Sequence, residues 1–215
     1  MINFDKTALV LIDLQQGILK MDYAPHTAEN VVQNANKLIE AFRKNNGFIA
    51  FVRVNFYDGK DALQPNAMIS LPAKEGDDYS HFHYLLDKRD DDFVIDKRHF
   101  SAFVGTDLDL QLRRRGIDTI VLGGVATHIG VDTTARDAYQ LNYNQYFVTD
   151  MMSAQNETLH QFPIDYVFPL MGQTITTNDL LNILNYTYTS PFDYIEGGIF
   201  ISQCINTSGC LTSTI

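Results

Sequence analysis

The chain has 215 residues, 45% of them hydrophobic, and this length and composition predict one globular domain with a buried core. Sixteen lysines and arginines against 26 aspartates and glutamates give a net charge of −10, which argues against nucleic acid or an anionic membrane as the main partner. The sequence has no apolar run of membrane-spanning length, no signal-type start and only two cysteines, so we expect a cytoplasmic protein without a disulfide framework.

Short apolar runs recur along the chain, and they have the length and the Val, Ile, Leu and Phe content of strands covered on both faces. Helical patterns lie between them. This alternation predicts an α/β fold, a three-layer open sheet of mostly parallel strands with helices on both faces. The expected strands are Thr7–Leu14, Phe48–Val54, Phe93–Ile95, Thr119–Val125 and Gln145–Thr149. The expected helices are Thr27–Asn46, Asp107–Arg115, Thr127–Leu141 and Thr177–Leu184.

Several boundaries can be predicted as well. Thr27 is the expected N-cap of the first helix and Gly47 its terminator. Residues 58–92 are polar, and we expect them to form a long excursion over the surface. We interpret residues 1–184 as one domain and residues 185–215 as a C-terminal extension of unknown role: an extra strand, an oligomer arm or a poorly ordered tail.

Polar residues follow three of the expected strands, at the edge where open α/β sheets bind ligands. Asp13 follows the apolar run 8–12, at the carboxyl end of the first strand, and Lys97 follows the third strand. The strand ending at Val125 passes into a helix that begins near Thr127, and the start of a helix offers unpaired N–H groups to an anion or a developing oxyanion. Taken singly, Asp13 could instead cap a loop, and Lys97 could be a solvated surface residue.

Three motifs in this order resemble the isochorismatase-like, or cysteine hydrolase, superfamily. They are Asp13-Leu14-Gln15, Lys97-Arg98-His99-Phe100-Ser101-Ala102-Phe103, and the turn from Gly123 through Thr134-Ala135-Arg136-Asp137-Ala138. The resemblance implies the Rossmann-type fold of that superfamily, a small-molecule substrate and a homo-oligomer. It also implies that Asp13 and Lys97 are catalytic and that the Val125–Ala126 peptide is cis.

Gly130 stands where the amide-cleaving members carry their nucleophilic cysteine. The run Gly124-Val125-Ala126-Thr127-His128-Ile129-Gly130 shares His-Ile-Gly with the isochorismatase branch, which hydrolyses a vinyl ether without a cysteine nucleophile. Similarity to that branch implies hydrolysis of a small, anionic metabolite by general acid catalysis from Asp13. Lys97 would bind the substrate, and backbone groups of Val125, Ala126 and Gly130 would form the oxyanion or substrate-binding turn.

The stretch after the second strand, residues 53–58, lacks the Asp-x-His metal motif of the nicotinamidase branch, so we expect no metal and no cofactor. Asn55 is a candidate hydrogen-bond donor to the substrate. His128 is either a ligand or general base, or a packing residue. Two other functions stay open at this point: a catalytically silent binding or assembly protein, and an amidase in which Asp13 activates water.

Overall fold

The computed structural model describes residues 2–62, 66 and 78–186, and its centre is a six-stranded parallel sheet of order β3-β2-β1-β4-β5-β6. The strands are β1 (Thr7–Ile12), β2 (Phe48–Val54), β3 (Val94–Lys97), β4 (Thr119–Val125), β5 (Asn144–Ser153) and β6 (Gln173–Ile175). The α-helices are α1 (Gln16–Leu19), α2 (Ala28–Lys44), α3 (Leu108–Arg114), α4 (Asp132–Gln140), α5 (Glu157–Tyr166) and α6 (Thr177–Tyr186). The predicted α/β class is confirmed. None of the helices in these residues is long and apolar enough to cross a membrane.

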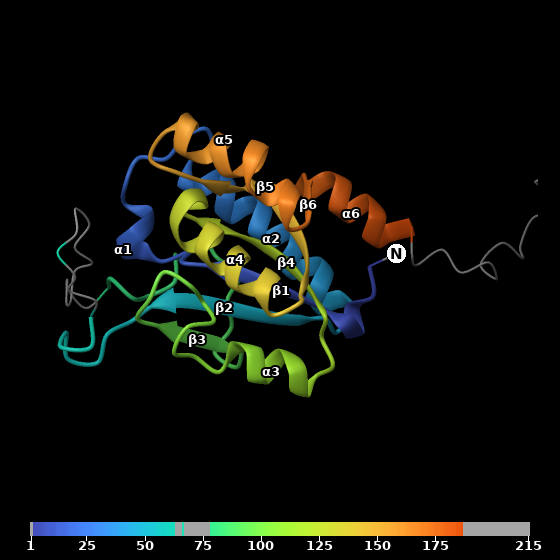
Figure 1. Ribbon diagram of the computed structural model, residues 1–215, viewed down its shortest axis with the longest axis horizontal. Helices are drawn as coiled ribbons and strands as arrows, with labels where there is room; N and C mark the ends of the chain where they lie inside the picture. Colours follow the sequence, from blue (N-terminus) through green and yellow to red (C-terminus); the bar gives the residue numbers. More distant parts are fainter. Residues whose placement is uncertain (1, 63–65, 67–77, 187–215) are drawn as a thin grey trace, which may run out of the picture.

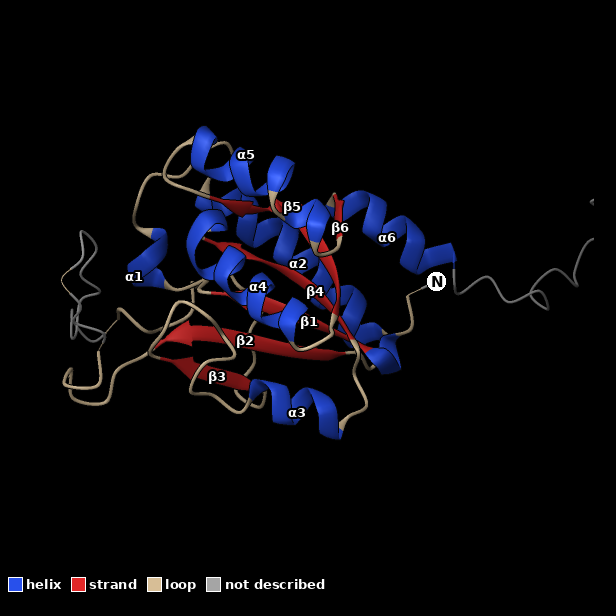
Figure 2. Ribbon diagram, viewed as in Figure 1, coloured by secondary structure: helices blue, strands red, loops and turns tan. Residues whose placement is uncertain are grey.

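The chain winds in opposite directions on the two sides of β1, and this places helices on both faces of the sheet (Figures 1 and 2). From β1 the chain proceeds to β2 and β3, whereas β4, β5 and β6 follow on the other side. Right-handed crossovers therefore put α2 on one face and α3, α4 and α5 on the other. Helix α6 packs beside α2 and completes the three layers.

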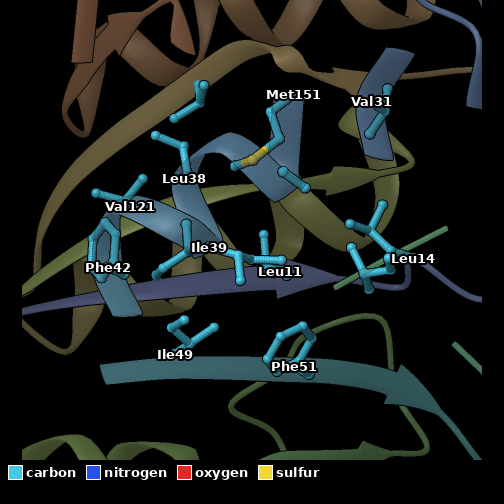
Figure 3. Close-up of a cluster of buried hydrophobic side chains, with 14 of the residues drawn as sticks. Leu11, Leu14, Val31, Leu38, Ile39, Phe42, Ile49, Phe51, Val121 and Met151 are labelled. Atoms are coloured by element: carbon cyan, nitrogen blue, oxygen red, sulfur yellow. The ribbon is translucent and has the colours of Figure 1, made fainter. Parts of the chain in front are cut away.

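Alternate residues of the strands point to opposite faces of the sheet and pack into two separate cores, as the pleat of a sheet requires. In β1, Leu9 and Leu11 face the α2 side, while Val10 and Ile12 face the α4 side. The core on the α2 side, shown in Figure 3, is formed by Leu11, Leu14, Val31, Leu38, Ile39, Phe42, Ile49, Phe51, Val121 and Met151, among others. Because both faces are covered, the β1 side chains from Thr7 to Ile12 are all buried, and this explains their continuous apolar run.

The end of α2 differs from the prediction. The left-handed residue is Asn46, with φ 54°, and the amide of Gly47 donates to the carbonyl of Phe42 at 2.8 Å. Gly47 is needed for close packing instead, since a Cβ there would lie 2.7 Å from Cδ1 of Phe42. The predicted N-cap is confirmed: the Thr27 side chain accepts from the amide of Asn30.

Other element boundaries also differ from the predicted ones. Strand β5 extends to Ser153, four residues beyond the expected end, and β3 reaches Lys97. Helix α5 and strand β6 were not predicted. Helix α6 continues through residue 186, and the remaining part of the predicted extension, residues 187–215, lies outside the described residues.

The order of the strands gives the sheet a switch point between β1 and β4. There, the connections leaving the carboxyl ends of the strands turn to opposite faces and leave a crevice between them. Asp13 follows β1, and the turn beginning at Ala126 follows β4. The two sequence motifs thus meet at the place where this class of fold binds ligands.

Candidate active site

Asp13 is the first residue after β1, and its backbone has φ 55°, in the left-handed region that aspartate tolerates better than most side chains. Its amide donates to the carbonyl of Val52 at 2.9 Å, which fixes the turn against β2. The residue is only 6% exposed. Its Oδ2 lies 2.8 Å from Nζ of Lys97, whereas its buried Oδ1 has no hydrogen-bond partner within the part of the chain that the structure describes.

Lys97 ends β3, and β2 lies between β3 and β1, so the ion pair of Lys97 with Asp13 spans the end of β2. Its side chain has no exposed surface. A buried ammonium group needs acceptors, and the Nζ of Lys97 donates both to Asp13 and to the carbonyl of Phe100, at 2.7 Å. The structure therefore brings together the two charged residues that the sequence singled out.

Burial and charge act on Asp13 in opposite directions. Burial raises the pKa of the Asp13 carboxyl, and the charge and hydrogen bond of Lys97 lower it by a smaller amount, so the pKa lies above its ordinary value. A carboxyl group of this kind holds its proton to a higher pH than an exposed aspartate does. It can then serve as a proton donor as well as an acceptor.

Gly130 faces this pair closely. A Cβ on Gly130 would lie 3.1 Å from Oδ2 of Asp13, 3.3 Å from Nζ of Lys97 and 3.0 Å from Cγ2 of Ile12. The position to which the family resemblance assigns a thiol thus borders the carboxylate and the ammonium group directly. A side chain there would be in tight contact, so its neighbours would have to move by a few tenths of an ångström.

The turn after β4 departs from the helix start that the sequence predicted. The Val125–Ala126 peptide is cis, residues Thr127–Val131 form one π-helical turn, and α4 begins only at Asp132. The hydroxyl of Thr134 donates to the carbonyl of Gly130 at 2.6 Å and accepts from the amide of Ala102 at 3.0 Å. The turn is thereby tied to the loop that follows Lys97.

Gln15, the third residue of the first motif, has a structural role. It is fully buried, its Nε2 donates to the carbonyl of Val54 at 2.9 Å, and its Oε1 accepts from the amide of Val54 at 2.6 Å. The side chain thus imitates a backbone pairing at the end of β2. Asn55 donates from its Nδ2 to Oδ2 of Asp96 at 2.9 Å, and its contact with a substrate stays a prediction.

Two residues near the site escaped sequence reasoning. One is Tyr23: burial, followed by the negative charges of Asp13 and Tyr79, raises the pKa of its phenol. His160 of α5 is 2% exposed, and its Nδ1 lies 2.9 Å from Oγ1 of Thr127. Neither residue belongs to a local motif, so only the folded chain relates them to Asp13 or to the turn.

His128, whose role the sequence left open, is half-buried, and its Nδ1 has no partner among the residues that the structure describes. Within residues 2–62, 66 and 78–186 there is also no group of three His, Cys, Asp or Glu side chains arranged to hold a metal ion.

The fold and the site together define a class: a hydrolase with the isochorismatase-like α/β fold, which has a buried aspartate–lysine pair beside a cis-peptide turn at the switch point. The family model described as "Isochorismatase domain" matches residues 7–179, and the chain belongs to the isochorismatase family. An uncharacterized isochorismatase family protein of Bacillus subtilis, YwoC, is 50% identical over 185 residues, which cover 84% of this chain and 95% of that protein. The structure of an isochorismatase family protein from Burkholderia thailandensis has a TM-score of 0.82 and 38% identity, covering 86% of this chain and 98% of the other.

More distant relatives carry two different activities in their names. The isochorismatase of Bacillus subtilis is 32% identical over 99 residues, covering 46% of this chain and 32% of that protein. The ureidoacrylate amidohydrolase RutB of Acinetobacter baylyi is 31% identical over 166 residues, covering 65% of this chain and 67% of that protein. The family therefore establishes a hydrolase. Which of the two reactions it catalyses has to be inferred from the residues of the site.

Proposed function

We propose that this hydrolase cleaves the enol (vinyl) ether bond of a small, anionic metabolite by general acid catalysis, with Asp13 as the acid and no covalent enzyme intermediate. The observation that carries the proposal is the arrangement at Gly130. The position of a thiol is empty of any side chain, and a buried carboxyl group with a raised pKa lies 3.1 Å from the point that a Cβ would occupy.

The reaction follows from this placement. The Asp13 carboxyl transfers its proton to the terminal carbon of the enol ether, where the C–H bond forms as the double bond is lost, and an oxocarbenium ion remains. Water adds to the cationic carbon and returns a proton to the Asp13 carboxylate. The resulting hemiketal moves its hydroxyl proton to the departing oxygen as the C–O bond breaks, which releases an alcohol and a 2-oxo acid.

The remaining groups hold the charges of the substrate. The ammonium group of Lys97 keeps Asp13 in place and offers a donor to a substrate oxygen or carboxylate. Backbone amides of the turn, at Ala126 and Gly130, are suited to the carboxylate of the enolpyruvyl group, because the first turn of a helix has unpaired N–H groups. Burial at the switch point keeps bulk water away from the oxocarbenium ion until one water molecule adds.

The first test uses isochorismate as the probe and measures release of pyruvate. We expect turnover by the wild-type protein and a loss of at least about 100-fold in kcat for Asp13→Asn, since the amide cannot donate the proton. Asp118→Asn is the matched control, because Asp118 is exposed and lies just before β4, at the amino ends of the strands and away from Asp13. Equal rates for wild type and Asp13→Asn would remove Asp13 from the mechanism.

A second assay separates the alternatives. A thiol-independent amidase would release ammonia from ureidoacrylate, and a silent binding protein would show a ligand-induced rise in melting temperature without turnover of either compound. A wild-type protein that releases no pyruvate from isochorismate would contradict the vinyl ether assignment.

A further inference from the structure

The turn that borders the active site is hydrogen-bonded to a buried polar network that takes no part in the proposed reaction. Thr127 is fully buried and is the second residue after the cis peptide, and its hydroxyl shares a hydrogen bond of 2.9 Å with Nδ1 of His160. His160 belongs to α5, which follows β5, so this bond joins the turn to an element 33 residues further along the chain.

His160 also packs against a second histidine. The ring of His26 meets it edge to face, with ring centroids 5.6 Å apart. His26 is held through its backbone, since its carbonyl accepts from the hydroxyl of Ser153 at 2.7 Å and its amide donates to the same hydroxyl at 3.3 Å. Ser153 ends β5 and pairs in register with Val125. The network therefore starts and ends beside the cis peptide.

His160 is neutral under ordinary conditions, because burial, assisted by His26, lowers its pKa to about 4. A neutral imidazole can share a hydrogen bond with Thr127 in either tautomer. The bond fixes the side chain of Thr127 and, through it, the backbone from Ala126 to Gly130, whose amides must point into the site if they are to bind an anion.

We propose that His160 is a positioning residue: through Thr127 it holds the backbone of the Ala126–Gly130 turn in the orientation that receives the anionic part of the substrate. This role rests on the proposed function, since it assumes that the turn binds the substrate. His160 itself does not touch the reacting atoms. Its loss should therefore loosen the turn and slow the reaction while the sheet stays folded.

Two pairs of variants isolate the hydrogen bond. Asparagine and leucine have the same branched shape, but only asparagine can bond to Thr127, and it can do so as donor or acceptor. His160→Asn should therefore keep the function, and His160→Leu should lose it. Thr127→Ser and Thr127→Val form the same comparison from the other side of the bond, and they serve if a variant at His160 does not fold.

Two readouts are measured on all four variants. For His160→Leu and Thr127→Val we expect kcat for pyruvate release from isochorismate to fall at least about tenfold, because small displacements of positioned groups are costly to the rate. We also expect faster amide hydrogen exchange in peptides covering residues 125–132, with unchanged exchange in α2. His160→Asn and Thr127→Ser should resemble the wild type in both readouts.

Equal behaviour of His160→Leu and His160→Asn, or unchanged exchange of residues 125–132 in His160→Leu, would overturn the proposal. The exchange measurement does not need a substrate. If the wild-type protein fails to release pyruvate while the turn still responds to His160→Leu and not to His160→Asn, the proposed function fails, whereas the role of His160 in holding the turn stands.

Discussion

At the scale of single residues, Gly130 and the Asp13–Lys97 pair share one small space. A methyl group on Gly130 would press on Asp13 at 3.1 Å and on Ile12 at 3.0 Å, which is tighter than ordinary van der Waals contact. We expect Gly130→Ala to lower the free energy of unfolding by about 1 to 3 kcal/mol and to reduce kcat, because the carboxylate must move. Urea unfolding and steady-state kinetics test both effects; an alanine variant with wild-type stability and rate would contradict this packing argument.

The same contact bears on the missing thiol. Gly130→Cys introduces the same Cβ, so we expect it to displace Asp13 or Lys97 before a nucleophile could act, and to gain no amidase activity towards ureidoacrylate. Ammonia release by Gly130→Cys, with Gly130→Ala as the control, is the measurement. Activity in the cysteine variant alone would show that the pocket still accepts an amidase arrangement.

Lys97 controls the pH at which Asp13 can act. Its charge lowers the pKa of the Asp13 carboxyl against the larger effect of burial, so Lys97→Met should raise that pKa further. If the acid form is active, kcat/KM falls as the pH rises through the pKa, and this alkaline limb should move upward by about one to three pH units. The pH profiles of wild type and variant test it, and a limb that stays in place or moves downward would contradict the acid role.

Single residues were predicted unevenly from the sequence. Asp13 and Lys97 could be found because each lies at the carboxyl end of a strand and belongs to a motif. The position of Asn55 after β2 gave no sign that its amide nitrogen would donate to Asp96, and its role in substrate binding stays a prediction. His160 gave no signal, because its contact with Thr127 bridges 33 residues and depends on how α5 packs.

At the scale of elements, the loop after β1 depends on one buried amide. Gln15 satisfies the backbone N–H and C=O of Val54 at the end of β2, and Gln15→Leu would leave both buried without partners. We expect a loss of about 2 to 4 kcal/mol in the free energy of unfolding, measured by urea unfolding. The exposed Gln161 is the control: Gln161→Leu should change stability by less than about 0.5 kcal/mol. Similar losses in both variants would contradict the role given to Gln15.

The elements that the sequence predicted are those with a strong periodic pattern. Helix α2 has a continuous apolar face, and β1, β2 and β4 are buried on both sides over most of their length, so their composition reveals them. Helix α5 contains Pro163 and buries only His160 and Pro163, and β6 has three residues with none buried, so neither has a clear pattern. Their places are set by packing against β5 instead.

At the scale of the whole molecule, His160 makes stability depend on pH. Its pKa falls from an ordinary 6.5 to about 4 on folding, so between these values the unfolded chain binds a proton that the native chain does not. The contribution of His160 to the free energy of unfolding should therefore be complete above pH 6.5 and decrease as the pH falls towards 4, by up to about 3 kcal/mol.

The raised pKa of Asp13 changes stability with pH in the opposite direction. Comparing the wild type with His160→Asn removes the contribution of Asp13, because both proteins contain it. Urea midpoints at pH 7 and pH 5 are the measurement, and an equal decrease in both proteins would contradict the assignment.

The homo-oligomer that the family resemblance implies stays a prediction. Light scattering of the full chain, measured over a range of concentrations, tests it directly. A monomer at every concentration would contradict the prediction and leave the active site, as described, complete within one chain.

The left-handed backbone of Asp13 has a consequence for how this site can change over time. Few L-residues accept φ near 55°, and aspartate, asparagine and glycine are the ones that accept it most readily. Mutations that reach any other side chain would strain the turn as well as alter the chemistry, so drift at this position is confined to a very small set. Within that set only aspartate carries an acid. A lineage that lost catalysis without losing the fold would most easily do so here, by a single exchange of one oxygen for nitrogen.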